Sequence, residues 1–331
     1  MGKGGAGALG FVAGGGVKAA AIVINHNGGE DLGLCLQSLL GQTVPVEVLL
    51  VDCASTDVSR RWVETPPPGV RVLALPENRG YTGGANAGLA ALAADGHVVG
   101  FFNPDCFPRP DFFAVCLEVF QKSSQVGGVA PRLLRPGEST LDSCGQVLSP
   151  WVLMVRDRGY GEPAFGRFLS PEKVLAACGA GMVYRREALE RVRVAGEVFP
   201  PEFFAFWEDL DLGWRVSACG YDLVYEPRAV AVHRRGATAR KGSGRLLFRR
   251  SPALAAGYLL NRWATLVRNL HIADAWWRLP LLVAWDMAMV AALVVRKPAV
   301  LSSLRAFPRR LALAFHQRRL LPQKRLRELL P

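Results

Sequence analysis

Four short apolar runs, separated by helix-length segments, constrain the fold of this chain more than any other feature. The runs cover residues 19–24, 46–51, 70–75 and 98–102. Uninterrupted apolar runs of this length are typical of strands buried on both faces. After the first run, Leu32 to Leu40 places apolar residues at helical spacing and is closed by Gly41. Strands that alternate with helices in this way predict a mostly parallel α/β sheet.

Polar residues that directly follow these strands are the first candidates for a binding site, because ligands of such sheets bind beyond the carboxyl ends of the strands. They are Asn27, Asp52, Asn78–Asn86 and Asn103–Asp105. The first strand is followed by neither G-x-G-x-x-G nor G-x-x-x-x-G-K-S/T, so neither a dinucleotide pocket nor a P-loop is indicated.

A glycine-rich segment from Asn78 to Gly88 comes after the third strand instead. We expect this segment to be a loop that opens a helix over Leu89 to Ala94. The free backbone N–H groups at such a helix start could receive a phosphate, and glycines would let it approach closely. An ordinary structural turn explains the same glycines equally well.

Asp105 lies just after the fourth strand. A carboxylate there can hold a divalent cation, which in turn can neutralise a diphosphate. His233 follows another short apolar run. A lone histidine is more often structural than a ligand, so His233 gains weight only if it converges with Asp105. Taken alone, Asp105 is better explained as an ordinary polar residue at a strand end.

Three carboxylates, Glu208, Asp209 and Asp211, follow the aromatic segment from Phe203 to Trp207 and form the strongest local signal. Aromatic surroundings desolvate a carboxylate and raise its pKa toward values useful for a general base. The alternative is the acidic first turn of an ordinary helix, which the helix dipole favours.

Composition excludes several classes of protein. The chain has 331 residues, of which 50% are hydrophobic and 21% charged, so it is neither disordered nor a disulfide-stapled mini-protein. Its seven cysteines are an odd number and form no C-x-x-C pair. This pattern argues against a zinc site and a secreted disulfide framework, and it fits a reducing cytosol.

Positive charge is concentrated toward the C-terminus. Residues 1–233 carry 20 Lys and Arg against 25 Asp and Glu, whereas residues 234–331 carry 20 against 3. Such asymmetry points to an anionic partner: nucleic acid, a membrane surface or a phosphorylated substrate. A solvated basic face is the alternative. The basic charge lies outside the α/β part and no nucleic-acid motif is present, so we expect no nucleic-acid partner.

After about residue 246 the sequence changes to helical patterns rich in leucine, arginine and tryptophan. Such helices suit the headgroup layer of a membrane, and a helix pair joining two subunits of a homodimer is the alternative. The most apolar stretch, 279–295, has Asp286 in its middle and is short for a span. We therefore expect it to lie in an interface rather than to cross a bilayer.

Seven motifs, taken in order, resemble those of the family 2 inverting glycosyltransferases, particularly the bacterial rhamnosyltransferase-like branch. They run from Ile22 to about Gly236 and read V-I-N-H-N-G, V-D-C-A-S-T-D, E-N-R-G-Y-T-G-G-A-N-A-G, F-N-P-D, C-G-A-G-x-x-x-R-R, W-E-D-L-D-L-G-W-R and V-H-R-R-G. The resemblance implies a GT-A fold with a mostly parallel nucleotide-binding sheet. The domains would be a flexible tail (1–18), a nucleotide-sugar half (19–130), an acceptor half (131–245) and a basic amphipathic helical region (246–331).

The resemblance also implies how the donor nucleotide-sugar is bound. Asn27, Asp52 and Asn78 would hold the base and the ribose. Gly80, Gly84 and Asn86 would line the nucleotide-sugar cleft. Asp105 matches the last residue of the family's D-x-D motif, and Asn103 stands where the first Asp of that motif is expected.

Roles in catalysis and acceptor binding follow in the same way. Asp105, assisted by His233, would hold Mg²⁺ or Mn²⁺. Asp209 matches the general base, with Glu208 beside it. The residues expected at the acceptor are Gly181, Trp207 and Arg215.

The implied reaction is the inverting transfer of a sugar, L-rhamnose from dTDP-rhamnose first, to a glycan or polyprenyl-linked acceptor in cell-envelope polysaccharide synthesis. The enzyme would act in the cytoplasm at the inner face of the cell membrane. UDP-hexose or UDP-galactofuranose transfer is the alternative within the enzyme class. An inactive scaffold with the same fold is the alternative outside it.

Overall fold

The computed structural model describes residues 18–92, 98–235, 248 and 250–329. The expected flexible tail over 1–18 lies outside these residues, except for Lys18. One sheet forms the centre, with strand order β10-β12-β6-β11-β4-β1-β2-β3, and β5 and β7 attach to β12 and β6. The strands of this sheet are β1 (Ala19–Asn25), β2 (Val46–Cys53), β3 (Val70–Leu75), β4 (Val98–Phe102), β5 (Cys106–Pro108), β6 (Val126–Leu134), β7 (Leu141–Ser143), β10 (Glu172–Lys173), β11 (Gly181–Arg185) and β12 (Asp222–His233).

The four strands predicted from the apolar runs are β1 to β4, and the prediction of a mostly parallel sheet is confirmed. β1 pairs in parallel with both β2 and β4, and β2 pairs in parallel with β3. β12 is parallel to β6, whereas β11 runs antiparallel to β4 and β6. The carboxyl ends of β1 to β4 therefore meet at one edge of the sheet.

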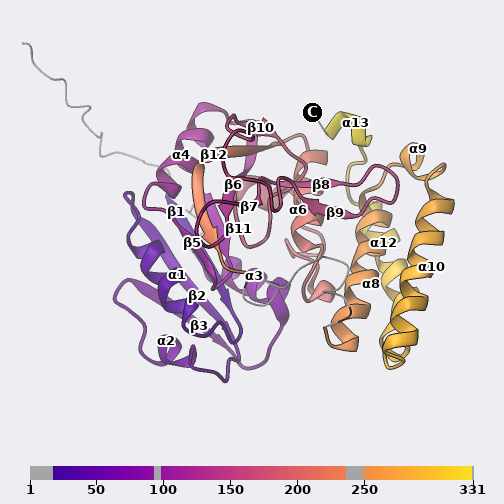
Figure 1. Ribbon diagram of the computed structural model, residues 1–331, viewed down its shortest axis with the longest axis horizontal. Helices are drawn as coiled ribbons and strands as arrows, with labels where there is room; N and C mark the ends of the chain where they lie inside the picture. Colours follow the sequence, from indigo (N-terminus) through magenta and orange to yellow (C-terminus); the bar gives the residue numbers. More distant parts are fainter. Residues whose placement is uncertain (1–17, 93–97, 236–247, 249, 330–331) are drawn as a thin grey trace, which may run out of the picture.

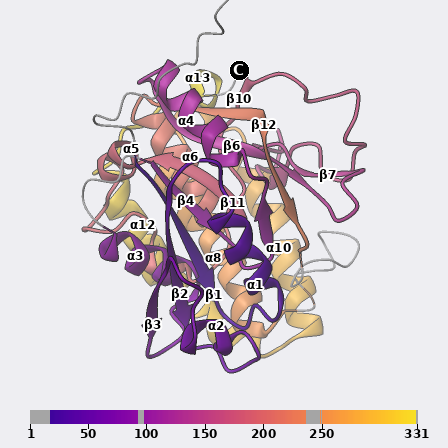
Figure 2. The ribbon, with the colours of Figure 1, turned by 90° about the vertical axis from the view of Figure 1, so that its left-hand side faces the viewer.

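Helices cover both faces of the sheet because successive side chains of each strand point to opposite sides. Ala21 and Val23 of β1 pack with α1 and α4, while Ile22 and Ile24 pack with α3, α5 and α6. These layers can be followed in Figure 1 and, from the side of the sheet, in Figure 2. The helices are α1 (Asp31–Leu40), α2 (Arg60–Glu64), α3 (Gly80–Ala91), α4 (Phe112–Lys122), α5 (Arg186–Arg191) and α6 (Glu208–Ala218).

The glycine-rich segment is itself helix α3, which corrects the expectation of a loop followed by a helix over 89–94. Gly80, Gly84 and Gly88 are spaced by four residues and share one face. A Cβ on Gly84 would lie 2.7 Å from Cγ2 of Ile24, and one on Gly88 would lie 2.6 Å from Cγ2 of Ile22. Glycine is therefore required for the close packing of α3 on the sheet.

The C-terminal region is helical, as expected, but its first helix is buried. Trp207, just before α6, shares an apolar cluster with Ala264 and Leu266 of α8. Leu210 and Trp214 of α6 belong to the same cluster. α10 lies at the outer edge of the molecule, farthest from the sheet (Figure 1). These helices are α8 (Pro252–Asn269), α9 (Ile272–Ala275), α10 (Leu279–Arg296), α11 (Val300–Leu304), α12 (Phe307–Arg318) and α13 (Leu326–Leu329).

A separate hairpin stands beside the main sheet. It consists of β8 (Gln146–Leu148) and β9 (Val155–Asp157), in which Gln146 pairs with Asp157. A short 3₁₀ turn, η1 (Pro201–Phe203), precedes α6.

Candidate active site

Asn25, the last residue of β1, organises the carboxyl ends of β1 and β2. Its Nδ2 donates to Oδ1 of Asp52 at 2.8 Å and contacts Oγ of Ser55 at 3.0 Å. Asp52 also accepts from the backbone N–H and the hydroxyl of Ser55. A carboxylate can accept about four hydrogen bonds, so Oδ2 of Asp52 keeps one position for a further donor. The sequence analysis missed Asn25, although a polar residue at the end of a fully apolar strand was a usable signal.

Asn27 connects the turn after β1 with the turn after β2. Its backbone is left-handed, with a φ of +56°, and its side chain is exposed. Its Oδ1 accepts from the backbone N–H of Thr56 at 2.8 Å and of Asp57 at 3.3 Å. Asn27 thus lies at the same edge as Asp52, where a ligand could reach it.

The residues of the glycine-rich segment mainly fix α3 in place. Oδ1 of Asn78 accepts from the N–H of Gly80 at 2.8 Å, at the start of the helix. Both amide atoms of Asn86 bond to the backbone of Phe199, at 2.8 and 3.0 Å. Gly84 faces the sheet. Asn78 therefore remains at the edge of the site, whereas Gly84 and Asn86 are occupied by packing.

Asp105 and His233 come together, as the sequence analysis required for His233 to count as a ligand. The pairing of β5 with β12 sets His233 opposite Cys106, directly beside Asp105. Nε2 of His233 lies 3.4 Å from Oδ1 of Asp105. Asn103 directly follows β4, and its backbone N–H donates to the carbonyl of Ala180 at 3.0 Å.

Asp142 holds the other ring nitrogen of His233. Its Oδ2 lies 2.8 Å from Nδ1, and the carboxylate, fully buried, also pairs with Arg235. Burial alone would lower the pKa of His233, but the hydrogen bonds to Asp105 and Asp142 outweigh burial and raise it to about 9. Asp142 lies in the irregular region between the two halves of the sequence, and no local pattern marked it.

The residues around Asp105 fit a divalent cation only in part. Among the described residues, no three His, Cys, Asp or Glu side chains are grouped to hold a metal. The pair of Asp105 and His233 nevertheless offers one carboxylate oxygen and, once a cation displaces the proton of the ring, one imidazole nitrogen. A histidine whose other nitrogen is fixed by a carboxylate is the usual arrangement behind a metal ligand. The pair could therefore supply two protein ligands to a divalent cation.

Asp209 lies in the first turn of α6 and is surrounded by uncharged donors. Its Oδ2 accepts from the N–H of Gly179 at 2.9 Å and from Nε2 of Gln146 at 2.7 Å, and its Oδ1 accepts from the N–H of Leu210. Burial raises the pKa of Asp209 above its usual range despite these bonds. This is the environment of a general base: a held carboxylate with an increased affinity for a proton.

Glu208 is more deeply buried than Asp209, and its Oε2 has no hydrogen-bond partner. Burial, followed by the negative charge of Asp209, raises the pKa of Glu208 well above its usual range. Gln146, which the sequence analysis missed, contacts Asp209 from hairpin strand β8.

The β8–β9 hairpin brings the two carboxylate clusters together. Gln146 contacts Asp209, and its pairing partner Asp157 bonds to Arg235, which in turn holds Asp142. Residues paired across antiparallel strands have Cα atoms about 5 Å apart. A continuous chain of contacts therefore links the candidate base to the Asp105–His233 pair.

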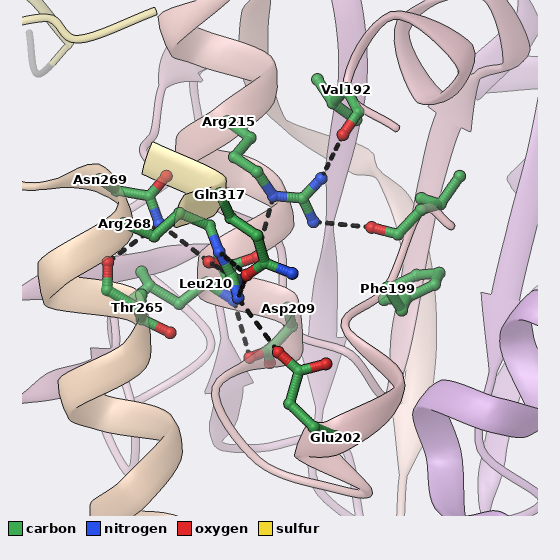
Figure 3. Close-up of polar contacts among 12 residues, drawn as sticks. Val192, Phe199, Glu202, Asp209, Leu210, Arg215, Thr265, Arg268, Asn269 and Gln317 are labelled. Atoms are coloured by element: carbon green, nitrogen blue, oxygen red, sulfur yellow. Dashed lines mark hydrogen bonds and ion pairs between the residues drawn. The ribbon is translucent and has the colours of Figure 1, made fainter. Parts of the chain in front are cut away.

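The three residues expected at the acceptor are buried in the structure, and their assignment to the acceptor stays a prediction. Gly181 lies in β11, where a Cβ would come within 3.0 Å of Sγ of Cys106. Trp207 and Arg215 are each 2% exposed. Arg215 donates to Asp211 at 2.8 Å and to the carbonyls of Val192 and Val198, as Figure 3 shows for Val192. In the structure these three residues are packed in the core.

Comparison with known proteins gives the family. Residues 20–193, more than half of the chain, match the model of glycosyl transferase family 2. The chain belongs to glycosyl transferase family 2. The sequence-based assignment to family 2 and to the glycosyltransferases is therefore confirmed.

Two kinds of curated relative resemble this glycosyltransferase. The N-acetylglucosaminyl-diphospho-decaprenol L-rhamnosyltransferase of Mycobacterium tuberculosis (strains H37Rv and CDC 1551) is 27% identical over 87% of this chain and 95% of its own length. The succinoglycan biosynthesis protein ExoO of Rhizobium meliloti (strain 1021) is 37% identical over 27% of this chain and 26% of its own length. The predicted likeness to rhamnosyltransferases and to polysaccharide-synthesis enzymes is thus confirmed.

Solved structures confirm the predicted GT-A fold. GalNAc-T7, crystallised with UDP, GalNAc and Mn²⁺, superimposes with a TM-score of 0.60 at 12% identity over 90% of this chain, which spans 57% of that protein. The mannosyltransferase PcManGT of Pyrobaculum calidifontis, in complex with GDP-Man and Mn²⁺, gives a TM-score of 0.52 at 21% identity over 91% of this chain and 87% of its own length.

Proposed function

We propose that this glycosyltransferase moves L-rhamnose from dTDP-rhamnose to a sugar joined through a diphosphate to a polyprenol, as a step in cell-envelope polysaccharide synthesis. The likeness to the mycobacterial rhamnosyltransferase carries the proposal. It covers 87% of the chain and so must extend well beyond residue 193, where the family match ends. The relative's name gives an acceptor of this lipid-linked kind.

Asp209 acts as the general base of the transfer. Gly179 and Gln146 hold its Oδ2, and its raised pKa favours uptake of the proton from the acceptor hydroxyl. The hydroxyl oxygen attacks the anomeric carbon from the face opposite the nucleotide diphosphate. A single displacement inverts the configuration of that carbon.

The donor binds at the carboxyl ends of β1 to β3. Asp52 keeps one acceptor position on Oδ2, and exposed Asn27 and half-buried Asn78 lie at the same edge. These groups hold the base and the sugar of the nucleotide. The Asn25 cluster keeps Asp52 in place for this contact.

Asp105 and His233 are the residues that hold a divalent cation, Mg²⁺ or Mn²⁺. When bound, the cation supplies positive charge that neutralises the diphosphate leaving group. Asp142 orients the His233 ring through Nδ1, and Arg235 keeps Asp142 in position.

The test of the reaction is direct transfer. The purified chain is incubated with Mn²⁺, a polyprenyl-diphospho-N-acetylglucosamine and one donor at a time: dTDP-rhamnose, UDP-glucose or UDP-galactofuranose. The expected product, detected by mass spectrometry, carries one added deoxyhexose and forms only from dTDP-rhamnose. Transfer from a UDP-sugar alone would replace the donor assignment, and absence of transfer from all three would favour the inactive scaffold.

The cation assignment is tested by thermal unfolding with dTDP, with and without Mn²⁺. A ligand that binds the folded state raises the Tm by mass action. We expect Mn²⁺ to increase the shift caused by dTDP, and Asp105→Ala to abolish that increase. Asp111→Ala, at an exposed position before α4, is the matched control. An equal Mn²⁺ effect in both variants would remove Asp105 from the cation site.

The lipid-linked acceptor requires contact with a membrane, and α10 provides the surface. By length and composition, α10 is the one helix among the described residues that could cross a bilayer. One of its faces packs inward, however, where both carboxylate oxygens of Asp286 accept from Nε of Arg262 at 2.9 and 3.0 Å. Arg262 is fully buried in α8. This ion pair supports a helix that lies along the surface of the protein.

The outward face of α10 is apolar, and the helix is flanked by cations. Trp285, Met287 and Val295 are exposed, and Arg278 and Arg296 stand at its two ends. Together with the charge of 20 Lys and Arg against 3 Asp and Glu over 234–331, this pattern matches the anionic inner face of a cell membrane. We assign α10 to in-plane contact with such a bilayer.

Vesicle sedimentation tests this contact. The chain should sediment with phosphatidylcholine vesicles that contain phosphatidylglycerol and much less with phosphatidylcholine alone. Trp285→Glu with Met287→Glu should abolish binding, whereas Val58→Glu, an exposed apolar residue outside this region, should not. Unchanged vesicle binding by the double variant would exclude α10 as the membrane contact. If the parent chain is a dimer and the double variant is a monomer, α10 is instead a subunit interface.

A further inference from the structure

The segment before the catalytic helix has an unusual backbone. Phe204, Phe206 and Trp207 have φ values of +61°, +75° and +72°, in the left-handed region that side chains other than glycine rarely adopt. Three such residues within four positions persist only where the surroundings hold them. The segment leads directly into Glu208 and Asp209, so its conformation sets the direction of the candidate base.

One side chain from the C-terminal region holds this segment. Nδ2 of Asn261, in α8, lies 2.9 Å from the carbonyl oxygens of Phe203, Ala205 and Phe206. Asn261 is fully buried. An amide nitrogen carries two hydrogens, so three acceptors share them. Every donor of this side chain is therefore used on the strained segment.

Arg310 of α12 fixes the orientation of that amide. Its Nη1 donates to Oδ1 of Asn261 at 2.6 Å. With the oxygen occupied by a cation, Nδ2 must face the segment 203–206. The opposite side of the segment is held by α3, where the N–H of Thr82 donates to the carbonyl of Phe204 at 3.2 Å. Gly80 leaves room for this approach, since a Cβ there would lie 2.3 Å from the same oxygen.

We infer that Asn261 is a positioning residue for catalysis: it clamps the left-handed segment 204–207 between α8 and α3 so that Asp209 keeps its direction into the site. The inference rests on the proposed role of Asp209. It gives the buried helix α8, outside the family match over residues 20–193, a function in the reaction. A displacement of about 1 Å in a catalytic group can lower the rate by about a hundredfold.

The test compares Asn261→Ala with Thr265→Val. Thr265 is one turn further along α8, is also fully buried, and its hydroxyl has no hydrogen-bond partner. Rhamnosyl transfer is measured with dTDP-rhamnose, and dTDP affinity by calorimetry. We expect Asn261→Ala to lower kcat at least tenfold with dTDP affinity within twofold of the parent chain, and Thr265→Val to change neither. Equal kcat in the two variants would overturn the inference.

Hydrogen exchange separates this inference from the reaction proposed above. In Asn261→Ala, amide exchange should accelerate at least tenfold in peptides covering 203–211 and stay unchanged over α1 and β1. If the parent chain transfers no rhamnose, the donor assignment fails while this result still supports the clamp. Unchanged exchange over 203–211 overturns the clamp whatever the reaction is. Arg310→Gln, which removes only the support of the amide, should give a smaller acceleration in the same peptides, and it replaces Asn261→Ala if that variant does not fold.

Discussion

The carboxylates on the two sides of α6 have opposite surroundings, and their pKa values shift in opposite directions. On the side of the site, Asp209 is held by the uncharged donors of Gly179 and Gln146, and burial raises its pKa. On the core side, two residues later, Asp211 contacts Arg268, Arg215 and Asn269. Burial would raise the pKa of Asp211, but the charges of Arg268 and then Arg215 outweigh it and lower that pKa.

The acidic start of α6 therefore contains two kinds of carboxylate, one suited to take up a proton and one that holds helices together. A carboxylate that must take a proton is kept away from cations, because a neighbouring positive charge would reduce its affinity for the proton. A carboxylate that must hold helices together is given cations, because a buried charge without a partner is costly. Asp211 joins α6 to α8 through Arg268, which also contacts Gln317 of α12. The side of the helix, rather than the residue type, decides the role.

Replacing the carboxylate on the site side should have the largest effect. Asp209→Asn keeps the shape of the side chain but cannot accept a proton at neutral pH. We expect kcat for rhamnosyl transfer to fall by about 10³-fold or more, at the upper range for loss of a general base. Binding of dTDP should survive, as calorimetry can check. Turnover close to that of the parent chain would remove Asp209 as the base.

Replacing the carboxylate on the core side should affect stability instead. Asp211→Ala leaves Arg215 buried without its anion and leaves Arg268 with only the longer pair to Glu202, at 3.4 Å. Breaking a buried pair in this way costs about 3–5 kcal/mol. Urea unfolding of the two chains measures the difference. The control is Asp222→Ala, which breaks the ion pair between Asp222 and Lys173. Their side chains are 35% and 41% exposed, so this change should lower the free energy of unfolding by about 1 kcal/mol or less. Equal losses in the two variants would contradict the comparison.

The contribution of Asp211 should also depend on pH in a defined direction. Its pKa is lower in the folded chain than in the unfolded chain. The stabilisation is therefore complete above the unfolded pKa of about 4 and is lost as pH falls through the folded pKa. The difference in unfolding free energy between the parent chain and Asp211→Asn should shrink below about pH 4. A difference independent of pH would mean that the carboxylate charge contributes nothing.

Uninterrupted apolar runs made the first four strands of the sheet predictable. The apolar runs located β1 to β4 within two residues at each end, because uninterrupted burial leaves a clear local pattern. The meeting of Asp105 and His233 was also anticipated, since both follow strands. Contacts across long sequence separations left no such pattern: Gln146 reaches Asp209 from 63 residues away, and Asp142 reaches His233 from 91.

Which side chains become buried could not be predicted from the local sequence. A motif gives the order of Trp207 and Arg215 around the acidic cluster but not the side of α6 on which each lies. The structure places both in the core, where Trp207 shares an apolar cluster with residues of α8 and Arg215 donates to the carbonyls of Val192 and Val198. The glycines of α3 were taken as a loop for a similar reason, because only the neighbouring sheet shows that small residues are needed for packing.

The pH dependence of the reaction can sharpen the comparison. A base acts in its deprotonated form, so kcat/KM should fall about tenfold per pH unit below the pKa of Asp209. Because burial raises that pKa, the fall should begin above the ordinary aspartate value of about 3.9. A pH profile of rhamnosyl transfer measures it, and the residual activity of Asp209→Asn should lack this fall. A fall that persists in the variant belongs to another group.

The smallest effect is expected from Gln146, which tunes Asp209 without reacting. Its Nε2 donates to Oδ2 of Asp209, and this bond lowers the pKa of the base against the effect of burial. Gln146→Leu should therefore move the acid side of the kcat/KM profile to higher pH and lower kcat by about tenfold at neutral pH, in line with loss of one hydrogen bond to a charged group. Ser143→Ala, a buried change in β7 that does not touch Asp209, is the control. A profile that stays in place while kcat falls would show that Gln146 only supports the hairpin, and the backbone N–H groups of Gly179 and Leu210 would then hold the base.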